Sequence, residues 1–438
     1  MNSPVSLRII SRDQHCISRR SISPNALRVL YRLRDAGFAA YLVGGAVRDL
    51  LLGRNPKDFD VATDATPDQL KQLFRNCRLI GRRFRLAHIV FGQEIIEVAT
   101  FRANDDDGSG DRKVHDGGLL LRDNVYGSIE DDAIRRDFTT NALYYAISDF
   151  SVRDYIGGFE DVQQRVLRLI GDPEQRYRED PVRMLRAIRL SAKLEFAIEE
   201  ATAEPIARLA GLLAEVAPAR LFEETLKLFL SGHAVASFEG LERFGLLDML
   251  LPQVVEALRS NRNGALRRVL IEGLRSTDAR VEADESVSPA FLFALLLWPA
   301  YCRALAVLQS QGMSLEEAQQ RAADRVTLNQ MQTIALPRRF SLPMREIWLM
   351  QPRFSTRQRK RVFRLLAHPR FRAAYDFMML RQVVSDEHAA DMAFWREVQQ
   401  KSGDELAEIF GPGGGAVEGE APPRRRGRRR LTITVDPE

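Results

Sequence analysis

The chain has 438 residues, 45% of them hydrophobic and 28% charged, which is typical of a soluble globular protein with about two to four domains. The longest apolar run, 291–299, is far shorter than a membrane span, so we expect no transmembrane segment. The N-terminus lacks the apolar core of a signal peptide, and Cys16, Cys77 and Cys302 are too scattered to predict disulfides or a zinc site. These features fit a reducing cytoplasm.

The net charge of +5 is unevenly distributed. Residues 421–438 contain six Arg against Asp436 and Glu438, a surplus of four, so the rest of the chain carries only about +1. Attraction to nucleic acid must therefore come from local basic patches and from this basic tail.

The first predicted elements lead into a Gly-Gly pair. Residues 1–22 are polar and Arg-rich without a clear period, and we interpret them as an N-terminal arm. Ser23 then predicts the cap of a helix over 25–36. An apolar run over 39–43 follows and predicts a buried strand, which the Gly-Gly pair ends.

The Gly-Gly pair has the chemistry of a phosphate site. Gly44 and Gly45 let backbone N–H groups approach a phosphate at the start of a helix predicted over 46–52, and Arg48 lies one turn further on. Taken alone, a Gly-Gly pair is more often an ordinary turn. The acids that follow it favour the phosphate interpretation.

Two carboxylates lie on the next predicted strand, 58–62. Side chains two apart on a strand share a face, so Asp58 and Asp60 are expected to point together. A cation between them would relieve their repulsion, and hard oxygen ligands suit Mg²⁺. A D-x-D pair alone is often a solvated edge, but beside a phosphate turn it indicates nucleotidyl transfer.

The motifs G-G-x-V-R-D and P-x-D-x-D-x-x-T within 41–64 resemble the signature of class II nucleotidyltransferases. This family contains the bacterial poly(A) polymerases and the tRNA CCA-adding enzymes. The resemblance implies an α/β polymerase-β-like nucleotidyltransferase head followed by an all-α neck, body and RNA-binding region. It also implies ATP as substrate, two Mg²⁺ ions bridged by Asp58 and Asp60, and phosphates held by Gly45 and Arg48.

A third acidic residue lies on the strands after the helix that begins near Pro67. Strands are predicted over 79–84, 87–91 and 95–101. Glu97 faces away from the core on the last of them, so it is either a solvated edge residue or a third metal ligand. The next stretch, 103–118, is rich in Gly and Asp, and we interpret it as a flexible loop with solvated acids.

The segment 129–145 reads IEDDAIRRDFTTNALYY and predicts Arg136 and Asp137 at the entry to an apolar helix. There the two could form a simple cap and ion pair. The family resemblance instead implies Arg136 near the nucleotide phosphates or sugar and Asp137 beside the metal pair. Either Glu97 or Asp137 would then be the third carboxylate.

A charged row follows on the helical segment 178–190, at a spacing of three residues, and comprises Asp180, Arg183, Arg186 and Arg189. Such a row is usually a solvated helix face. The row resembles the family's E-D-x-x-R motif, which implies that the acid and the first Arg face the incoming base. The later Arg residues would then approach phosphates.

The remainder of the sequence is helical, with clear patterns over 218–230, 291–298 and 315–331. Arg and Lys are frequent between Arg353 and Arg372, where Asp and Glu are absent, so this segment is either a phosphate-binding patch or a basic helix face.

The expected organisation has five parts: arm 1–22, head 23–170, neck with a base-binding motif 171–235, body and RNA-binding region 236–410, and a disordered Gly/Arg-rich tail 411–438.

Within the family, the stretch 79–89 (LIGRRFRLAHI) resembles the bacterial poly(A) polymerases. This implies template-independent addition of AMP from ATP to RNA 3′ ends, which promotes RNA turnover; a tRNA CCA-adding nucleotidyltransferase is the alternative. RNA 3′ ends and ATP are the implied partners. RNA-degradation or RNA-chaperone proteins are further candidates, and we expect a cytoplasmic monomer.

Overall fold

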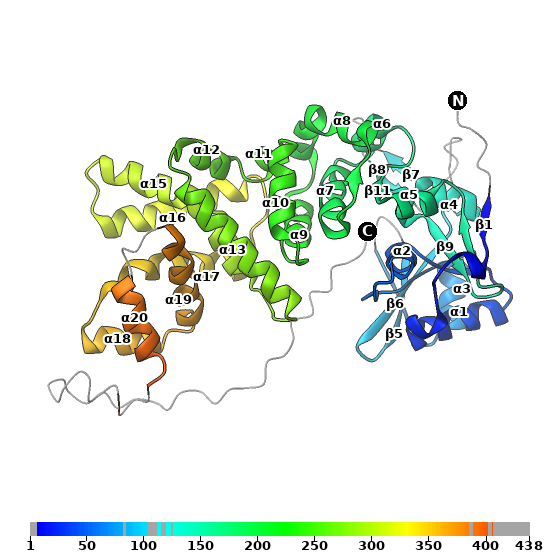
Figure 1. The fold of residues 1–438 in the computed structure, drawn as a ribbon, viewed down its shortest axis with the longest axis horizontal. Coiled ribbons are helices and arrows are strands. Elements are labelled where there is room, and N and C mark those ends of the chain that lie inside the picture. The colour runs from blue at the N-terminus through cyan, green and yellow to red at the C-terminus, as the bar shows by residue number, and fades with distance from the viewer. Residues whose placement is uncertain are drawn as a thin grey trace. The chain divides into compact units, whose positions relative to one another are not determined.

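The computed structural model describes residues 7–81, 85–103, 112–114, 120–123, 126–384, 389–401 and 405. Over the third and fourth of these ranges it describes the backbone alone. The acids of 105–107 and the predicted tail, 411–438, lie outside the described residues. The described residues form two compact units, which divide between Leu212 and Leu213 (Figure 1).

The first unit is built on one mixed sheet, of which eight strands lie in the described residues. Only β3 and β6 pair in parallel; the other neighbours are antiparallel. In spatial order the strands are β1 (Arg8–Ile10), β10 (Val152–Asp154), β9 (Leu143–Ala146), β2 (Ala40–Val43), β3 (Asp60–Thr63), β6 (Glu94–Thr100), β5 (Leu86–Phe91) and β4 (Cys77–Ile80).

Three helices pack against this sheet through a shared apolar core, and they are α1 (Pro24–Asp35), α2 (Gly45–Leu51) and α3 (Pro67–Leu73). The Ser23 hydroxyl caps α1 by accepting the N–H groups of Asn25 and Ala26, as predicted. Residues 8–22 are not an arm beside the head. Their strand β1 pairs with β10, and Ile10 and Ile17 are buried in the same core.

The apolar helix predicted after Arg136 and Asp137 does not form. Helix α4 (Ile129–Arg135) ends before Arg136, a 3-10 turn covers Thr139–Asn141, and the chain continues as strand β9. All four residues of β9 are buried, because Leu143 and Tyr145 pack into one apolar cluster and Tyr144 into another. Burial on both faces produces a continuous apolar run that resembles a helix in sequence.

The predicted loop 103–118 contains a strand. Strand β7 (Arg112–Val114) pairs antiparallel with β8 (Leu120–Asp123), so the loop interpretation is wrong over 112–114. The pair forms a separate two-stranded sheet outside the head sheet.

The rest of the first unit is mainly helical. Its elements are α5 (Gly158–Gln164), β11 (Val166–Leu167), α6 (Pro173–Glu179), α7 (Val182–Leu194), β12 (Ala197–Ile198) and α8 (Glu200–Leu209). The predicted continuous helix 178–190 is broken at Asp180, which is extended at φ −151° and ψ 93°. Pro181 explains the break, since a residue that precedes proline disfavours the helical conformation.

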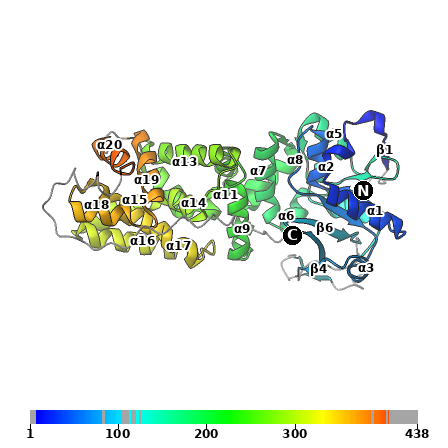
Figure 2. The same cartoon turned by 90° about the horizontal axis from the view of Figure 1, so that it is seen from below.

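The second unit is helical throughout its described part. Its helices are α9 (Pro218–Phe229), α10 (Ala234–Arg243), α11 (Leu246–Leu250), α12 (Pro252–Ser260), α13 (Ala265–Glu282), α14 (Pro289–Leu296), α15 (Trp298–Ser310), α16 (Leu315–Met331), α17 (Arg338–Met350), α18 (Arg359–Leu366), α19 (Phe371–Arg381) and α20 (Ala389–Val398). Helices α15 and α16 lie side by side (Figure 2). Of the described helices, none is by itself long and apolar enough to cross a membrane, although α14 and α15 pass that test as a pair bent by 52°.

Gly158 marks a close backbone contact in the head. Asp154 accepts the N–H groups of Gly157 and Gly158 with one carboxylate oxygen and that of Phe159 with the other, which holds the start of α5. A Cβ on Gly158 would lie 2.2 Å from the carbonyl oxygen of Thr139. Helix α5 can therefore approach the Thr139–Asn141 turn only through a glycine.

We expect Gly158→Ala to lower the free energy of unfolding of the head by about 1–3 kcal/mol, because the methyl group pushes α5 away from the turn. Urea denaturation measures this change. Gly211→Ala is the matched control, since a Cβ there meets no described heavy atom within 4 Å. A Gly158 variant as stable as the control would contradict the contact.

Candidate active site

The two acids predicted to bind metal lie at the start of β3. The strand begins at Asp60 and not at Asp58, because pairing with β2 starts at the Val43–Asp60 pair. Asp58 precedes the strand and is exposed, whereas Phe59 between the two acids is buried. The acids are close enough for the charge of Asp58 to act on the Asp60 carboxylate.

Glu97 lies beside Asp60 on the sheet. Strand β6 runs parallel to β3, and Glu97 is in register with Asp60. Because β6 lies between β3 and β5, Glu97 is not on an edge strand. Its Oε1 is 3.6 Å from Nε2 of His88 on β5. The fold thus brings together two of the predicted acids that are distant in sequence.

The Asp60 carboxyl is in an unfavourable place for a negative charge. Burial raises its pKa to about 6, nearby Arg136 opposes that rise, and the charge of Asp58 adds to it. Among the described residues, no group of three His, Cys, Asp or Glu side chains is arranged to hold a metal ion. The acids therefore do not form a closed protein site for a cation.

The Gly-Gly turn lies directly beside Asp60. Gly44 has φ +76° and precedes α2, so it adopts a conformation that favours glycine. A Cβ built on Gly44 would lie 3.6 Å from Oδ2 of Asp60 and 3.7 Å from Nη1 of Arg136. The predicted phosphate turn, one acid and one arginine thus meet at this point.

Arg48 is buried and points into the head. Its Nε and Nη2 donate to Oδ1 of Asp49 at 2.9 and 2.7 Å, and its Nη1 donates to Oδ1 of Asn141. A Cβ on Gly45 would lie 3.2 Å from Nη2 of Arg48. In this structure Arg48 supports the Gly-Gly turn from the protein side.

Asp137 is engaged by protein groups. Nε and Nη2 of Arg186 donate to Oδ2 at 2.8 and 2.6 Å, and the N–H of Phe138 and the amide of Asn141 donate to Oδ1. Burial alone would raise the pKa of Asp137, but the Arg186 guanidinium and these hydrogen bonds hold it well below its usual range. Asp137 therefore anchors α7 to the segment after α4.

The other members of the charged row have separate surroundings. Asp180 is buried between α6 and α7, where its Oδ1 accepts the N–H of Val182. Nη1 of Arg183 donates to the Arg176 carbonyl at 2.7 Å and to Oε2 of Glu179 at 3.1 Å. Arg189, further along the same helix, is partly exposed.

Sequence reasoning missed four residues that organise this site: Asp132, Asn141, Tyr144 and Arg176. Asn141 joins Arg48 to Asp137. Arg176 donates to the carbonyl oxygens of Arg135 and Arg136 at 2.8 and 2.7 Å. Asn141, a polar residue that directly precedes the apolar run 142–147, is the one that the sequence could have indicated.

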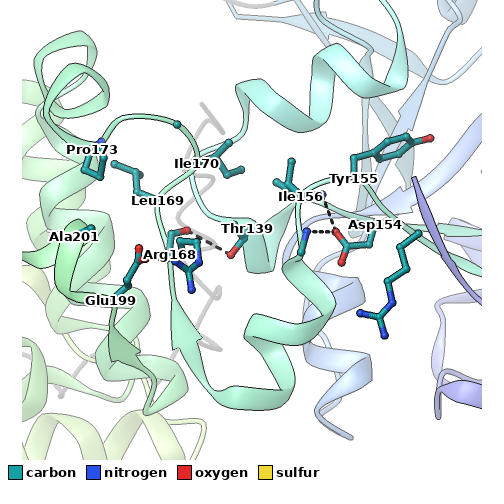
Figure 3. A pocket seen from close by; sticks show the side chains of 13 residues that line it. Thr139, Asp154, Tyr155, Ile156, Arg168, Leu169, Ile170, Pro173, Glu199 and Ala201 are labelled. Atoms are coloured by element: carbon teal, nitrogen blue, oxygen red, sulfur yellow. Dashed lines mark hydrogen bonds and ion pairs between the residues drawn. The ribbon is translucent and has the colours of Figure 1, made fainter. Parts of the chain in front are cut away.

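A cavity of about 550 Å³ lies beside Thr139, which follows Asp137 closely in the chain (Figure 3). Thr139, Asp154 and Arg168 are among its lining residues, and none of the predicted site residues lines it. Arg168 is paired with Asp161 and Glu199 there. The cavity is therefore not part of the candidate site.

We expect Asp137→Asn to lower the free energy of unfolding by about 2–4 kcal/mol at neutral pH, because it leaves the Arg186 charge uncompensated. The pKa of Asp137 is lowered in the folded protein, so its contribution is present above about pH 4 and is lost as the pH falls. Urea denaturation between pH 3 and 7 should show the gap to the parent closing in acid.

The matched control is Asp376→Asn, which removes the exposed pair with Arg372. It should change the free energy of unfolding by less than about 1 kcal/mol. An Asp137 variant as stable as this control at pH 7 would contradict the anchoring role.

Three family models match the chain. The poly A polymerase head domain matches residues 40–168, the probable RNA and SrmB-binding site of polymerase A matches 195–258, and the arginine-rich C-terminus of polymerase A matches 311–431. Poly(A) polymerase I of Salmonella typhi is 50% identical over 428 residues, which cover 96% of this chain and 91% of that protein.

CCA-adding enzymes are more distant relatives. The enzyme of Lactobacillus helveticus is 37% identical over 214 residues, which cover 49% of this chain and 52% of that protein. The solved structure of the Bacillus stearothermophilus CCA-adding enzyme in complex with CTP is 25% identical, covers 90% of each chain and has a TM-score of 0.56. These likenesses confirm the predicted α/β head with a helical remainder. With half of its residues shared along nearly its whole length, the chain belongs to the poly(A) polymerase family of nucleotidyltransferases.

Proposed function

We propose that the protein adds AMP from ATP to RNA 3′ ends without a template and releases pyrophosphate. The observation that supports this proposal most directly is that Asp60, Gly44 and Arg136 lie next to one another in the head. In this reaction the RNA 3′-hydroxyl oxygen attacks the α-phosphorus of ATP, and the bond to the pyrophosphate group breaks. The site must therefore hold a triphosphate and counter its charge.

The acids fit a divalent cation. Burial raises the pKa of the Asp60 carboxyl to about 6 and the charge of Asp58 adds to the rise, so that a cation beside Asp60 would be favoured. Mg²⁺ is usually held by one or two carboxylates together with substrate phosphates, which suits a site without three converging protein ligands. When bound, two Mg²⁺ ions would lower the pKa of the 3′-hydroxyl and neutralise charge on the triphosphate.

The residues around Asp58 and Asp60 would bind the phosphates and complete the set of acids. Gly44 and Gly45 admit the phosphates close to the backbone, and Arg136, whose Nη1 lies beside Gly44, meets their charge. Glu97 is the better candidate for a third acid than Asp137, whose two oxygens already accept hydrogen bonds from protein groups. Asp137 holds the neck helix instead.

The neck supplies the selection of the base. Asp180 and Arg183 lie at the start of α7, where a carboxylate and a guanidinium offer both acceptors and donors to a base edge. Arg186 and Arg189 continue the row: Arg186 holds Asp137, and Arg189 is partly exposed further along the same helix. The helical second unit would bind the RNA body, and the natural setting of this reaction is the cytoplasm.

We expect Asp58→Asn and Asp60→Asn each to lower the rate of AMP addition at least ~10²–10³-fold, because each removes a charge that the transition state needs. Extension of a labelled RNA with ATP measures the rate. Asp64→Asn, an exposed acid just after the same strand, is the matched control and should stay near the parent rate. Activity of either site variant within tenfold of the parent would refute the assignment.

Nucleotide choice separates the proposed reaction from its alternative. With an unrelated RNA and ATP alone, the protein should produce long tails of mixed length, and with CTP alone it should add little. Gel analysis of the products measures both. If the protein instead adds two C and one A to a tRNA that lacks its 3′ end, and then stops, it is a CCA-adding enzyme.

A further inference from the structure

Arg136 is held by two residues that have no role in the mechanism described above. Its Nε and Nη2 donate to Oδ2 of Asp132 at 3.1 and 3.0 Å. Nε also donates to the hydroxyl oxygen of Tyr144 at 3.0 Å, and that hydroxyl in turn donates to Oδ2 of Asp132 at 2.7 Å. One carboxylate oxygen thus accepts from both the arginine and the tyrosine.

Two of the three residues of this cluster are buried. Asp132 is 4% exposed and Tyr144 is fully buried. The second oxygen of Asp132 accepts the backbone N–H of Arg102 at 3.4 Å, and the Arg136 guanidinium lies 5.3 Å from the centre of the Tyr144 ring. Burial would raise the pKa of Asp132, but the Arg136 charge and these hydrogen bonds lower it, so the acid stays ionised. The guanidinium therefore has little freedom to rotate.

The cluster decides which edge of Arg136 reaches the active site. With Nε and Nη2 turned towards Asp132, Nη1 lies on the side of the Gly-Gly turn, where it donates a long hydrogen bond of 3.5 Å to the carbonyl oxygen of Asn141. There it lies 3.7 Å from the position of a Cβ on Gly44, close to the Asp60 carboxylate. When hydrogen bonds fix one edge of a guanidinium, its other edge points in a defined direction. A ligand that binds this edge then costs little further side-chain rotamer entropy.

We propose that Asp132 and Tyr144 are positioning residues that orient Arg136 towards the triphosphate of ATP. The proposal rests on the proposed function, in which Arg136 meets the phosphates. In the alternative account, the buried ion pair stabilises the head and has no effect on nucleotide binding. The two accounts differ in what Tyr144→Phe changes, since that substitution removes one hydroxyl and keeps the ring.

The test compares the parent, Tyr144→Phe and the matched control Tyr145→Phe, which lies on the same strand, has no part in the cluster and is also buried. We expect Tyr144→Phe to raise the KM for ATP and the inhibition constant of pyrophosphate about 5–20-fold, as loss of one or two hydrogen bonds to a charged group implies. The KM for RNA and the Tm should match those of the control.

A double-mutant cycle makes the test specific. In an Arg136→Ala background, Tyr144→Phe should change the KM for ATP less than about twofold, because its effect passes through the arginine. Equal effects in both backgrounds, or a fall in Tm with no change in KM for ATP, would overturn the proposal. Asp132→Asn serves as a second variant and should weaken ATP more than RNA.

Calorimetric titration with ATP in the absence of RNA separates this proposal from the proposed function. A parent that binds ATP but transfers no AMP would refute the function, while weaker ATP binding by Tyr144→Phe would still support the positioning role. Unchanged ATP affinity in Tyr144→Phe and Asp132→Asn, with an active parent, would refute the positioning role alone. A parent that does not bind ATP would overturn both.

Discussion

The candidate site depends on the ion pair between Asp137 and Arg186. Two guanidinium nitrogens hold one carboxylate oxygen at 2.6 and 2.8 Å, in a region where neither charge is well solvated. The pair connects the segment after α4 to helix α7, and Arg176 reinforces the connection by donating to two carbonyl oxygens of the same segment. This connection fixes helix α7 against the segment that carries Arg136 and Asp137.

The arginines of the candidate site differ in how fully they are paired with acids of the protein. Arg48 and Arg186 are neutralised by Asp49 and Asp137 and hold the architecture together. Arg136 is also paired, but one of its nitrogens is left on the side of the Gly-Gly turn. Compensation of Arg48 and Arg186 within the protein limits the cost of their burial.

Arginines of the second unit are also paired with acids from other segments of the chain. Asp and Glu are absent between Arg353 and Arg372 in the sequence, yet the fold brings acids from other segments to several of these arginines. Arg357 pairs with Asp391, and Arg370 lies 3.4 Å from Glu346. The basic character of this segment is therefore reduced by tertiary neighbours. Its attraction for RNA depends on the remaining cations and on their spacing, which is a property of the folded helices.

The sequence by itself determined the features that depend on near neighbours. The Gly-Gly turn, the cap at Ser23 and the helix over 315–331 follow from local geometry and periodicity, and the structure contains each of them. Tertiary structure alone decided that 143–146 is a strand, because burial on both faces removes the alternation that marks a strand. It also decided the partners of the charged side chains. A hydrogen bond requires approach to within about 3 Å, and no local pattern shows which distant residue the fold will bring that close to Asp137.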